Sequence, residues 1–148
     1  MEVRKIHEDE LKQLAKLFDE YRIFYQQKSD IALAEVFLAE RIKNSESEIF
    51  VAVSTQGVVT GFVQLYPLFS STRMKKLWLL NDLYVHPDFR GKGISKNLIE
   101  EAKKLCITTN ACGFILETAK NNMIGNKLYP SAGLSLDELH NYYYWERS

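Results

Sequence analysis

The sequence predicts a single domain of the α/β (α+β) class, in which helices flank a central sheet. Three observations support this. Apolar residues recur at helical spacing in several segments, and two alternating segments around Gly57 have the pattern of a β-hairpin. In addition, a buried strand near the middle of the chain leads through a glycine-bearing loop into a helix. A chain of 148 residues has the usual length of one domain, so we treat residues 1–148 as one unit.

The first half of the chain predicts a strand, two helices and a hairpin. Residues 2–6 form the opening strand, and a helix follows with apolar side chains at helical spacing as far as Tyr21. A second helix follows Ser29-Asp30, a natural N-cap. Residues 48–54 and 58–66 are the hairpin strands, which Pro67 is expected to end, so that residues 69–76 form a polar, basic loop.

The second half predicts alternating strands and helices. The central strand runs from about Leu77 to Val85, and a Pro-Asp turn separates it from a helix that runs from Gly93 to about Thr108. A short strand, a short helix and at least one closing strand follow, at residues 114–118, 123–131 and 139–146. The complete order is β-α-α-β-β-β-α-β-α-β-β.

The segment between the central strand and its helix is a candidate phosphate site. Residues 90–95 read Arg-Gly-Lys-Gly-Ile-Ser and open an amphipathic helix. The N-terminus of a helix presents unpaired N–H groups and a positive dipole end, which together bind anions. The loop lacks the Gly-Lys-Ser/Thr ending of an ATP-binding P-loop and the third glycine of a dinucleotide site.

This segment resembles the acyl-CoA site of the GNAT (GCN5-related N-acetyltransferase) superfamily. The signature there is Gln/Arg-x-x-Gly-x-Gly/Ala, and Arg90, Gly93 and Ser95 fill its three positions. Ser95 replaces the usual glycine or alanine and is still small. The helix after the 114–118 strand resembles the second half of the family, with Asn122 and the Leu128-Tyr129 pair in register. Further matched or replaced positions are Gly125 for alanine, Gly133, and Leu134 for phenylalanine.

The resemblance implies a mixed, mostly antiparallel GNAT sheet that is splayed between the central strand and the 114–118 strand. It also implies acetyl-CoA as co-substrate, with its pantetheine arm in the gap and its pyrophosphate on the amides of the loop. Asn122 and Lys127 would contact the cofactor, or else be ordinary helix-surface residues. The cofactor-binding residues implied are Leu83, Tyr84, Val85, Arg90, Gly91, Lys92, Gly93, Ile94, Ser95, Asn122, Lys127 and Tyr129.

The resemblance also implies catalytic residues for attack of an amine on the thioester. Tyr129 matches the tyrosine that protonates the coenzyme A sulfur. Glu117 matches the catalytic glutamate of ribosomal-protein N-terminal acetyltransferases and ranks first as the base. Asp82 ranks second, because strand alternation directs it to the other face unless a bulge intervenes. Asn81 stands where polyamine acetyltransferases carry a glutamate, and its amide can only hold a water that relays a proton.

Three alternatives for the function stay open. The central strand and the segment from Gln64 to Ser71 look like bacterial small-amine and polyamine acetyltransferases, so we expect a small amine as acceptor. Glu20, Asp82 and Glu117 are candidates to surround its positive charge. A protein or peptide N-terminus, or a lysine, is the alternative acceptor, since Glu117 matches that subgroup. A non-catalytic acyl-CoA sensor is the third hypothesis.

Composition narrows the partners. Nineteen basic and nineteen acidic side chains cancel, so neither nucleic acid nor an anionic membrane is an expected partner. The N-terminus has no apolar signal-peptide core, and a cytoplasmic location is expected. The two cysteines and three histidines lack metal-ligand spacing, so no metal is expected. The aromatic run at residues 142–145 suits either a homodimer contact or a half-buried strand.

Overall fold

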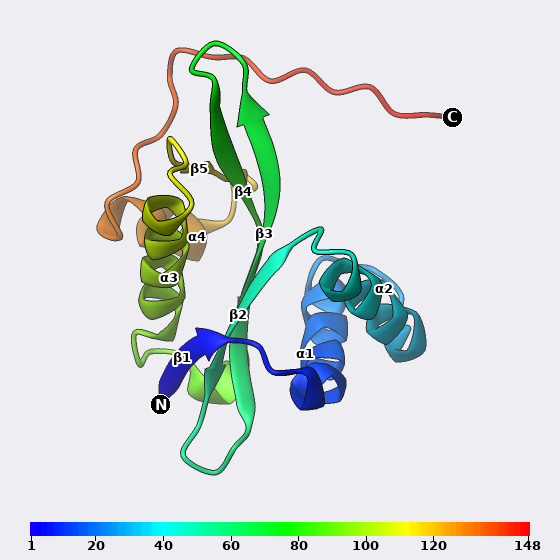
Figure 1. Ribbon diagram of the computed structural model, residues 1–148. Helices are drawn as coiled ribbons and strands as arrows, with labels where there is room; N and C mark the ends of the chain where they lie inside the picture. The colour runs from blue at the N-terminus through cyan, green and yellow to red at the C-terminus, as the bar shows by residue number, and fades with distance from the viewer. The chain divides into compact units, whose positions relative to one another are not determined.

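Figure 1 shows a computed structural model of the chain, which describes all residues from 1 to 148. The chain forms two compact units, Met1–Glu117 and Thr118–Ser148. The first unit holds a five-stranded sheet and its flanking helices, and the second holds one helix and the C-terminal segment. That both units act as a single domain stays a prediction.

The sheet of the first unit is mixed and mostly antiparallel, as predicted. Its strand order is β1-β2-β3-β4-β5, with every neighbouring pair antiparallel except β4 and β5, which are parallel. The strands are β1 (Glu2–Lys5), β2 (Glu48–Val53), β3 (Val59–Ser70), β4 (Lys75–Val85) and β5 (Phe114–Ile115). The helices of both units are η1 (Glu8–Glu10), α1 (Leu11–Phe24), α2 (Ile31–Lys43), η2 (Pro87–Phe89), α3 (Ile94–Thr108) and α4 (Met123–Ser131).

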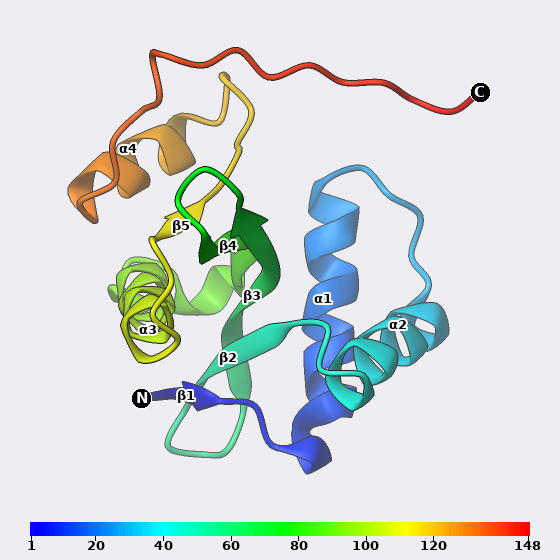
Figure 2. The ribbon, with the colours of Figure 1, turned by 45° about the horizontal axis from the view of Figure 1, so that its top comes forward.

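Helices cover both faces of the sheet in the first unit. Figure 2 shows α1 and α2 on one face and α3 on the other. On the first face, Phe18 of α1 packs against Phe62 of β3, and both are buried. The apolar stripe of α3 is buried as predicted, at Ile94, Leu98, Ile99, Ala102 and Leu105. Burial of these side chains is the main stabilising term for the fold.

Side-chain hydrogen bonds cap α2 and hold the segment that connects α1 to α2. Asp30 caps α2 as predicted, because its carboxylate accepts the N–H of Leu33 at 3.0 Å. The buried carboxylate of Asp19, on α1, accepts the Ser29 hydroxyl and the Asp30 N–H, both at 2.7 Å. The connection between α1 and α2 is therefore anchored to α1.

None of the helices is long and apolar enough to cross a lipid bilayer.

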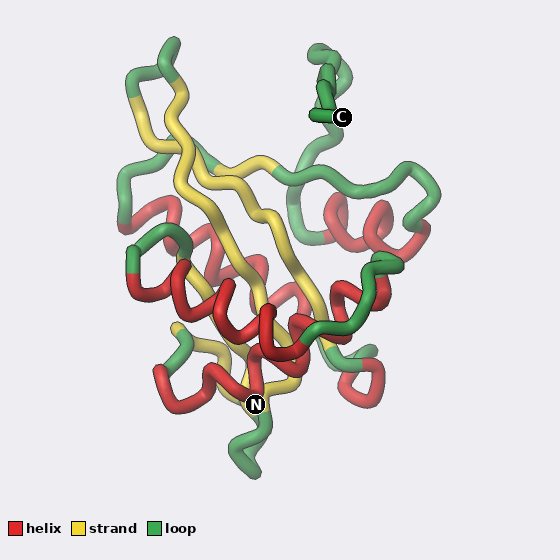
Figure 3. Tube along the Cα trace, turned by 90° about the vertical axis from the view of Figure 1, so that its right-hand side faces the viewer, coloured by secondary structure: helices red, strands yellow, loops and turns green.

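The prediction that Pro67 ends its strand is wrong. Figure 3 shows β3 and β4 as long paired strands, and Pro67 lies opposite Trp78 within them. Thr60 accepts a hydrogen bond from His86, so odd-numbered residues of β3 direct their backbone groups away from β4. Pairing with β2 stops at Leu65, so the missing N–H of Pro67 faces an open edge and costs no hydrogen bond. The predicted loop at residues 69–76 shrinks to a four-residue turn between Ser70 and Lys75.

The predicted closing strand at residues 139–146 is also wrong. The segment after α4 has no strand in Figure 1, and the side chains of Tyr142 to Trp145 are between 75% and 93% exposed. A strand requires a neighbour for its backbone hydrogen bonds, and none pairs with this segment. The strand predicted at residues 114–118 does form, but pairs only at Phe114 and Ile115.

Candidate active site

The centre of β4 contains a bulge at Asn81. Gln64 of β3 lies opposite Asp82, whereas the next residue, Leu65, lies opposite Leu80, so Asn81 is an extra residue in β4. After a bulge of this kind, the side chains of the following residues point to the other face of the sheet, and their backbone groups point to the other edge. A bulge is the condition under which the sequence predicts that Asp82 changes face.

The bulge places Asp82 on the α1/α2 face of the sheet. Before it, the indole N–H of Trp78 donates to the hydroxyl of Thr109, the C-cap residue of α3, so Trp78 lies on the α3 face. After it, the Tyr84 ring packs against Tyr21 of α1, with ring centroids 6.0 Å apart. Without the extra residue, Trp78, Asp82 and Tyr84 would all share one face. The bulge therefore carries a carboxylate to the face covered by α1.

The same bulge leaves an open backbone edge at the end of β4. The parallel pairing with β5 covers only Trp78 and Leu79. Beyond the bulge, His86 donates to Thr60 of β3, so alternation directs the backbone groups of Leu83 and Val85 away from β3. No strand pairs with this edge there. An extended amide chain can therefore add to it as a further strand would.

The loop after β4 leads into the uncapped start of α3. Gly91 and Gly93 have φ angles of +76° and +77°, which favour glycine, and α3 starts at Ile94. The first backbone hydrogen bond of α3 runs from the Asn97 N–H to the Gly93 carbonyl, and no side chain caps the helix. The amides of the first turn, including those of Ile94 and Ser95, are thus available to an anion.

The two cations of the loop are fixed by different contacts. The Nε of Arg90 donates to the Val85 carbonyl at 3.0 Å, and its guanidinium lies over the Tyr84 ring, 5.4 Å from the centroid. Arg90 therefore ties the loop to the end of β4. Lys92 is exposed, with its ammonium group 5.2 Å from the centroid of the Phe89 ring. Both residues belong to the loop that precedes the uncapped start of α3.

Gly61 of β3 is a functional candidate that the sequence analysis missed. A Cβ added at this residue would lie 3.1 Å from the Tyr84 carbonyl oxygen and 3.3 Å from Cγ2 of Ile94, the first residue of α3. Gly61 thus permits the anion-binding end of α3 to approach the sheet closely. The available signal was a glycine inside a strand, which often marks such an approach.

The Asp82 carboxylate is buried among hydrogen-bond donors. It accepts the side-chain amide of Gln64 at 2.8 Å and that of Asn81 at 3.0 Å, and the phenol of Tyr21 also favours its ionised form. Burial is the larger influence, and it raises the pKa of Asp82 above the ordinary value for aspartate. The pKa of Tyr66 is raised to about 12, first by burial and then by the Asp82 charge.

The other two carboxylates proposed for the acceptor site differ from Asp82. Glu20 lies on the same side, where its Oε2 is 3.8 Å from Nε2 of His86 and its charge contributes to raising the pKa of Tyr84. Tyr84 is mostly buried, and burial is the first cause of that rise. Glu117 is exposed at the end of the first unit and makes no hydrogen bond or ion pair.

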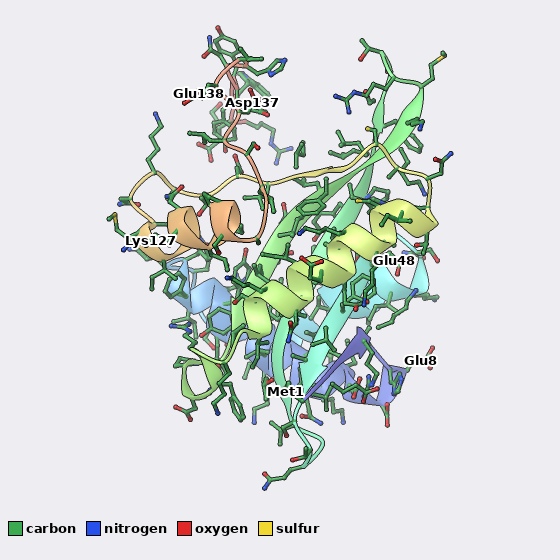
Figure 4. The ribbon with its side chains drawn as sticks, turned by 90° about the vertical axis from the view of Figure 1, so that its left-hand side faces the viewer. Met1, Glu8, Glu48, Lys127, Asp137 and Glu138 are labelled. Carbon is green, nitrogen blue, oxygen red and sulfur yellow. The ribbon has the colours of Figure 1, made fainter.

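The second unit holds the remaining predicted residues. Asn122 is the N-cap of α4: its carbonyl oxygen accepts the Gly125 N–H at 3.1 Å, and its amide donates to Thr118 at 2.9 Å. A Cβ at residue 125 would lie 2.6 Å from that amide nitrogen, so glycine suits this position better than the family's alanine. Tyr129 is half-buried on α4, and Lys127 is exposed on the same helix (Figure 4).

An open strand edge that leads into an uncapped helix end can take up an extended amide chain that carries a phosphate. The sequence matches the acetyltransferase (GNAT) family over residues 11–134, so the protein belongs to this family. It is an acetyltransferase of the GNAT type, as the sequence analysis predicted. Members of the family use acetyl-CoA and an acceptor substrate.

Individual relatives agree with this assignment. The chain is 39% identical over 137 residues to the uncharacterized N-acetyltransferase YhfO of Bacillus subtilis, covering 93% of this chain and 91% of the relative. The crystal structure of a protein described as a probable acetyltransferase matches with a TM-score of 0.95 and 33% identity, covering 100% and 99% of the two chains. An aminoglycoside N-acetyltransferase, solved in complex with CoA, shares the fold with a TM-score of 0.76 at 20% identity, covering 99% and 100%.

Proposed function

We propose that this protein transfers the acetyl group of acetyl-CoA to a primary amine by direct attack in a ternary complex, and that the acceptor is a small amine or polyamine. The observation that carries the proposal is the bulge at Asn81. It turns a buried carboxylate towards α1 and, in the same strand, turns the backbone of Leu83 and Val85 to an open edge. An acceptor amine and a thioester would meet across this strand.

The cofactor would bind along β4 and the loop that follows it. The amide groups of its pantetheine arm pair with the backbone of Leu83 and Val85, and its pyrophosphate lies on the amides of residues 91–95. Arg90 and Lys92 add positive charge beside the phosphates. Lys127 and the cap residue Asn122 are further proposed contacts from the second unit. An aminoglycoside N-acetyltransferase of the same fold has been solved in complex with CoA, which supports CoA as the ligand.

In the proposed reaction the amine nitrogen attacks the carbonyl carbon of the thioester, and a tetrahedral oxyanion forms. A backbone N–H near Val85 stabilises the oxyanion, a base accepts the amine proton, and Tyr129 donates its proton to the departing thiolate. We propose Asp82 as the base, because it is buried and its pKa is raised towards the range useful for proton transfer. Glu117 remains the alternative base.

The surroundings of Asp82 favour a small cationic acceptor. A buried carboxylate attracts an ammonium group strongly, because little water screens it. The phenol oxygens of Tyr21 and Tyr66 can accept hydrogen bonds from this ammonium group. The carboxylate of Glu20 can balance its positive charge. A peptide N-terminus or a lysine side chain is the alternative acceptor, and binding of acyl-CoA without catalysis is the alternative function.

The experiment that tests the proposal is a panel of initial rates of thiol release from acetyl-CoA. The panel holds polyamines, monoamines, aminoglycosides, amino acids and short peptides, with hydrolysis in the absence of acceptor as baseline. Selective turnover of small amines is the expected result. Turnover of peptides alone would overturn the proposed acceptor, and binding of CoA with no turnover of any class would favour the sensor hypothesis.

Gly61→Val is expected to weaken CoA binding about tenfold or more, because overpacking costs about 1–3 kcal/mol and the added methyl groups displace the start of α3. Isothermal titration calorimetry with CoA measures the effect. The matched control is Val63→Ile, which also overpacks a buried position of β3, two residues further along the strand. Equal loss of affinity in both variants would show a general packing effect and contradict the role of Gly61.

We also propose that the protein forms a homodimer through its C-terminal aromatic residues. Tyr143 and Trp145 are 93% and 82% exposed, and contiguous apolar side chains of this kind usually mark an interaction surface. The double variant Tyr143→Ser/Trp145→Ser is expected to shift a dimer to a monomer in analytical ultracentrifugation. Phe69→Ser, which removes an aromatic residue that is 76% exposed at the end of β3, is the control. A wild-type protein that sediments as a monomer would refute the dimer.

A further inference from the structure

Asp82 is the end of a buried chain of hydrogen bonds that starts at Ser47. The Ser47 hydroxyl donates to Oε1 of Gln64 at 2.8 Å, and Nε2 of Gln64 donates to Oδ2 of Asp82 at 2.8 Å. Gln64 is 0% exposed in the middle of β3, and Ser47 precedes β2. A fully buried glutamine has no water for its amide, so its partners determine its orientation. Ser47 and Asp82, at the two ends of the Gln64 amide, therefore together determine which way it points.

The hydrogen bonds of this chain can reverse their donor-to-acceptor direction, and each of its oxygen and nitrogen atoms still has a partner. A hydroxyl is both donor and acceptor, and a side-chain amide carries one donor end and one acceptor end. When Asp82 is ionised, the donors point from Ser47 through Gln64 to the carboxylate. When Asp82 carries a proton, its O–H donates to Gln64 Oε1 after the amide turns over, and Nε2 then donates to the Ser47 oxygen. A methionine at position 64 or an alanine at position 47 removes this adaptability.

We propose that Ser47 and Gln64 are positioning residues that hold the Asp82 carboxylate in place in both of its protonation states. The inference rests on the proposed function, in which Asp82 takes the proton of the acceptor amine. The chain does not touch substrate or cofactor; it acts through Asp82. Such a device suits a base that must gain and release a proton in each turnover, because an unpaired polar group in either state would be costly.

Other groups also face Asp82 and must be kept constant in a test. Asn81 donates to its second oxygen, Tyr21 contributes from α1, and Tyr66 senses its charge from β3. Arg41 of α2 acts on Tyr66 in the opposite direction. The interactions of these groups with Asp82 do not involve Ser47. Changes at Ser47 and Gln64 therefore alter the chain while the rest of the carboxylate's surroundings persist.

The test is a direct titration of Asp82 by carbon-13 NMR of aspartate-labelled protein, with the Asp82 signal assigned from Asp82→Asn. Gln64→Met removes a donor that stabilises the carboxylate, so the Asp82 titration is expected to move to higher pH. Ser47→Ala is expected to move it in the same direction by less, and Ser47→Thr, which keeps the hydroxyl, to restore it. Thr60→Val removes another buried hydroxyl of β3, which donates to Ala52, and is expected to leave the titration unchanged. An unchanged titration in both Gln64→Met and Ser47→Ala overturns the proposal.

The same variants are then assayed for acetyl transfer to the best amine. For Gln64→Met, kcat/KM is expected to fall about tenfold at pH 6 and to stay within about twofold at pH 9, since more of the base is protonated at the lower pH. A moved titration with an unchanged rate profile would show that the chain positions Asp82 but that Asp82 is not the base. That outcome overturns the proposed base, whereas the NMR result alone decides whether the chain acts on Asp82.

Discussion

Replacing Tyr129 with phenylalanine is expected to lower kcat by about 10²–10³-fold and to leave CoA binding within about twofold. The phenol is the only group that the exchange removes, and the ring stays in place. If Tyr129 protonates the coenzyme A sulfur, its loss forces a thiolate to leave unprotonated. A residue that served only to pack α4 would lose little, because phenylalanine fills the same volume.

The local structure of the second unit makes this exchange a clean test. Tyr129 lies on α4, whose start is fixed by the Asn122 cap, and its backbone carbonyl accepts the N–H groups of Ala132 and Leu134 at the end of the helix. Neither set of bonds uses the phenol. The caps at both ends of the helix should therefore persist in the variant.

The measurement is thiol release under saturating acetyl-CoA and amine, with CoA affinity determined separately by calorimetry. Tyr143→Phe is the matched control, because it removes a phenol from a residue that is 93% exposed and outside the proposed site. Full activity in Tyr129→Phe would exclude Tyr129 as the acid. Loss of CoA binding along with turnover would instead assign the phenol to cofactor binding.

Asp82→Asn is expected to have the second large effect, a loss of at least about 100-fold in kcat/KM together with a gain in stability at pH 8. Asparagine has the size of aspartate and cannot accept the amine proton. The Gln64 amide can turn over and accept a hydrogen bond from the new side chain while donating to Ser47. The fold therefore tolerates the exchange, but the proposed base is gone.

The gain in stability follows from the direction of the Asp82 pKa shift. Burial raises the folded-state pKa above the value in the unfolded chain, so the protonated form favours folding. That contribution is complete below the unfolded pKa and is lost as the pH rises through the folded pKa. At pH 8 the wild type contains a buried charge that Asp82→Asn lacks. The Tm of the wild type should therefore be lower than that of the variant by roughly 2–5 °C. Near pH 3, below the unfolded pKa, the difference should vanish.

Thermal denaturation at the two pH values and amine acetylation rates measure both effects on one protein. Glu117→Gln is the comparison for the rates, since Glu117 is the alternative base and is exposed. A large loss in Glu117→Gln with little loss in Asp82→Asn would assign proton removal to Glu117. A Tm for Asp82→Asn that stays below that of the wild type at both pH values would contradict the electrostatic argument.

Elements with local signals could be predicted from the sequence alone. The apolar stripe of α3, the Asp30 cap of α2, the glycines at residues 91 and 93 and the bounds of α4 all follow from neighbouring residues in the chain. The same local pattern predicted the family and the anion-binding loop. It overestimated the last strand, because aromatic alternation at residues 139–146 supplies no partner for the backbone.

The use of the two edges and two faces of β4 depends on contacts between distant segments. Strand alternation is a local rule, and a single extra residue at Asn81 reverses it for Asp82, Leu83 and Val85. The pairing partner that reveals the bulge, Gln64, lies 18 residues away in the chain. The close approach of Gly61 to Ile94 and the chain from Ser47 to Asp82 likewise join distant segments. Pairing and packing between distant segments set these contacts, and no local pattern in the sequence encodes them.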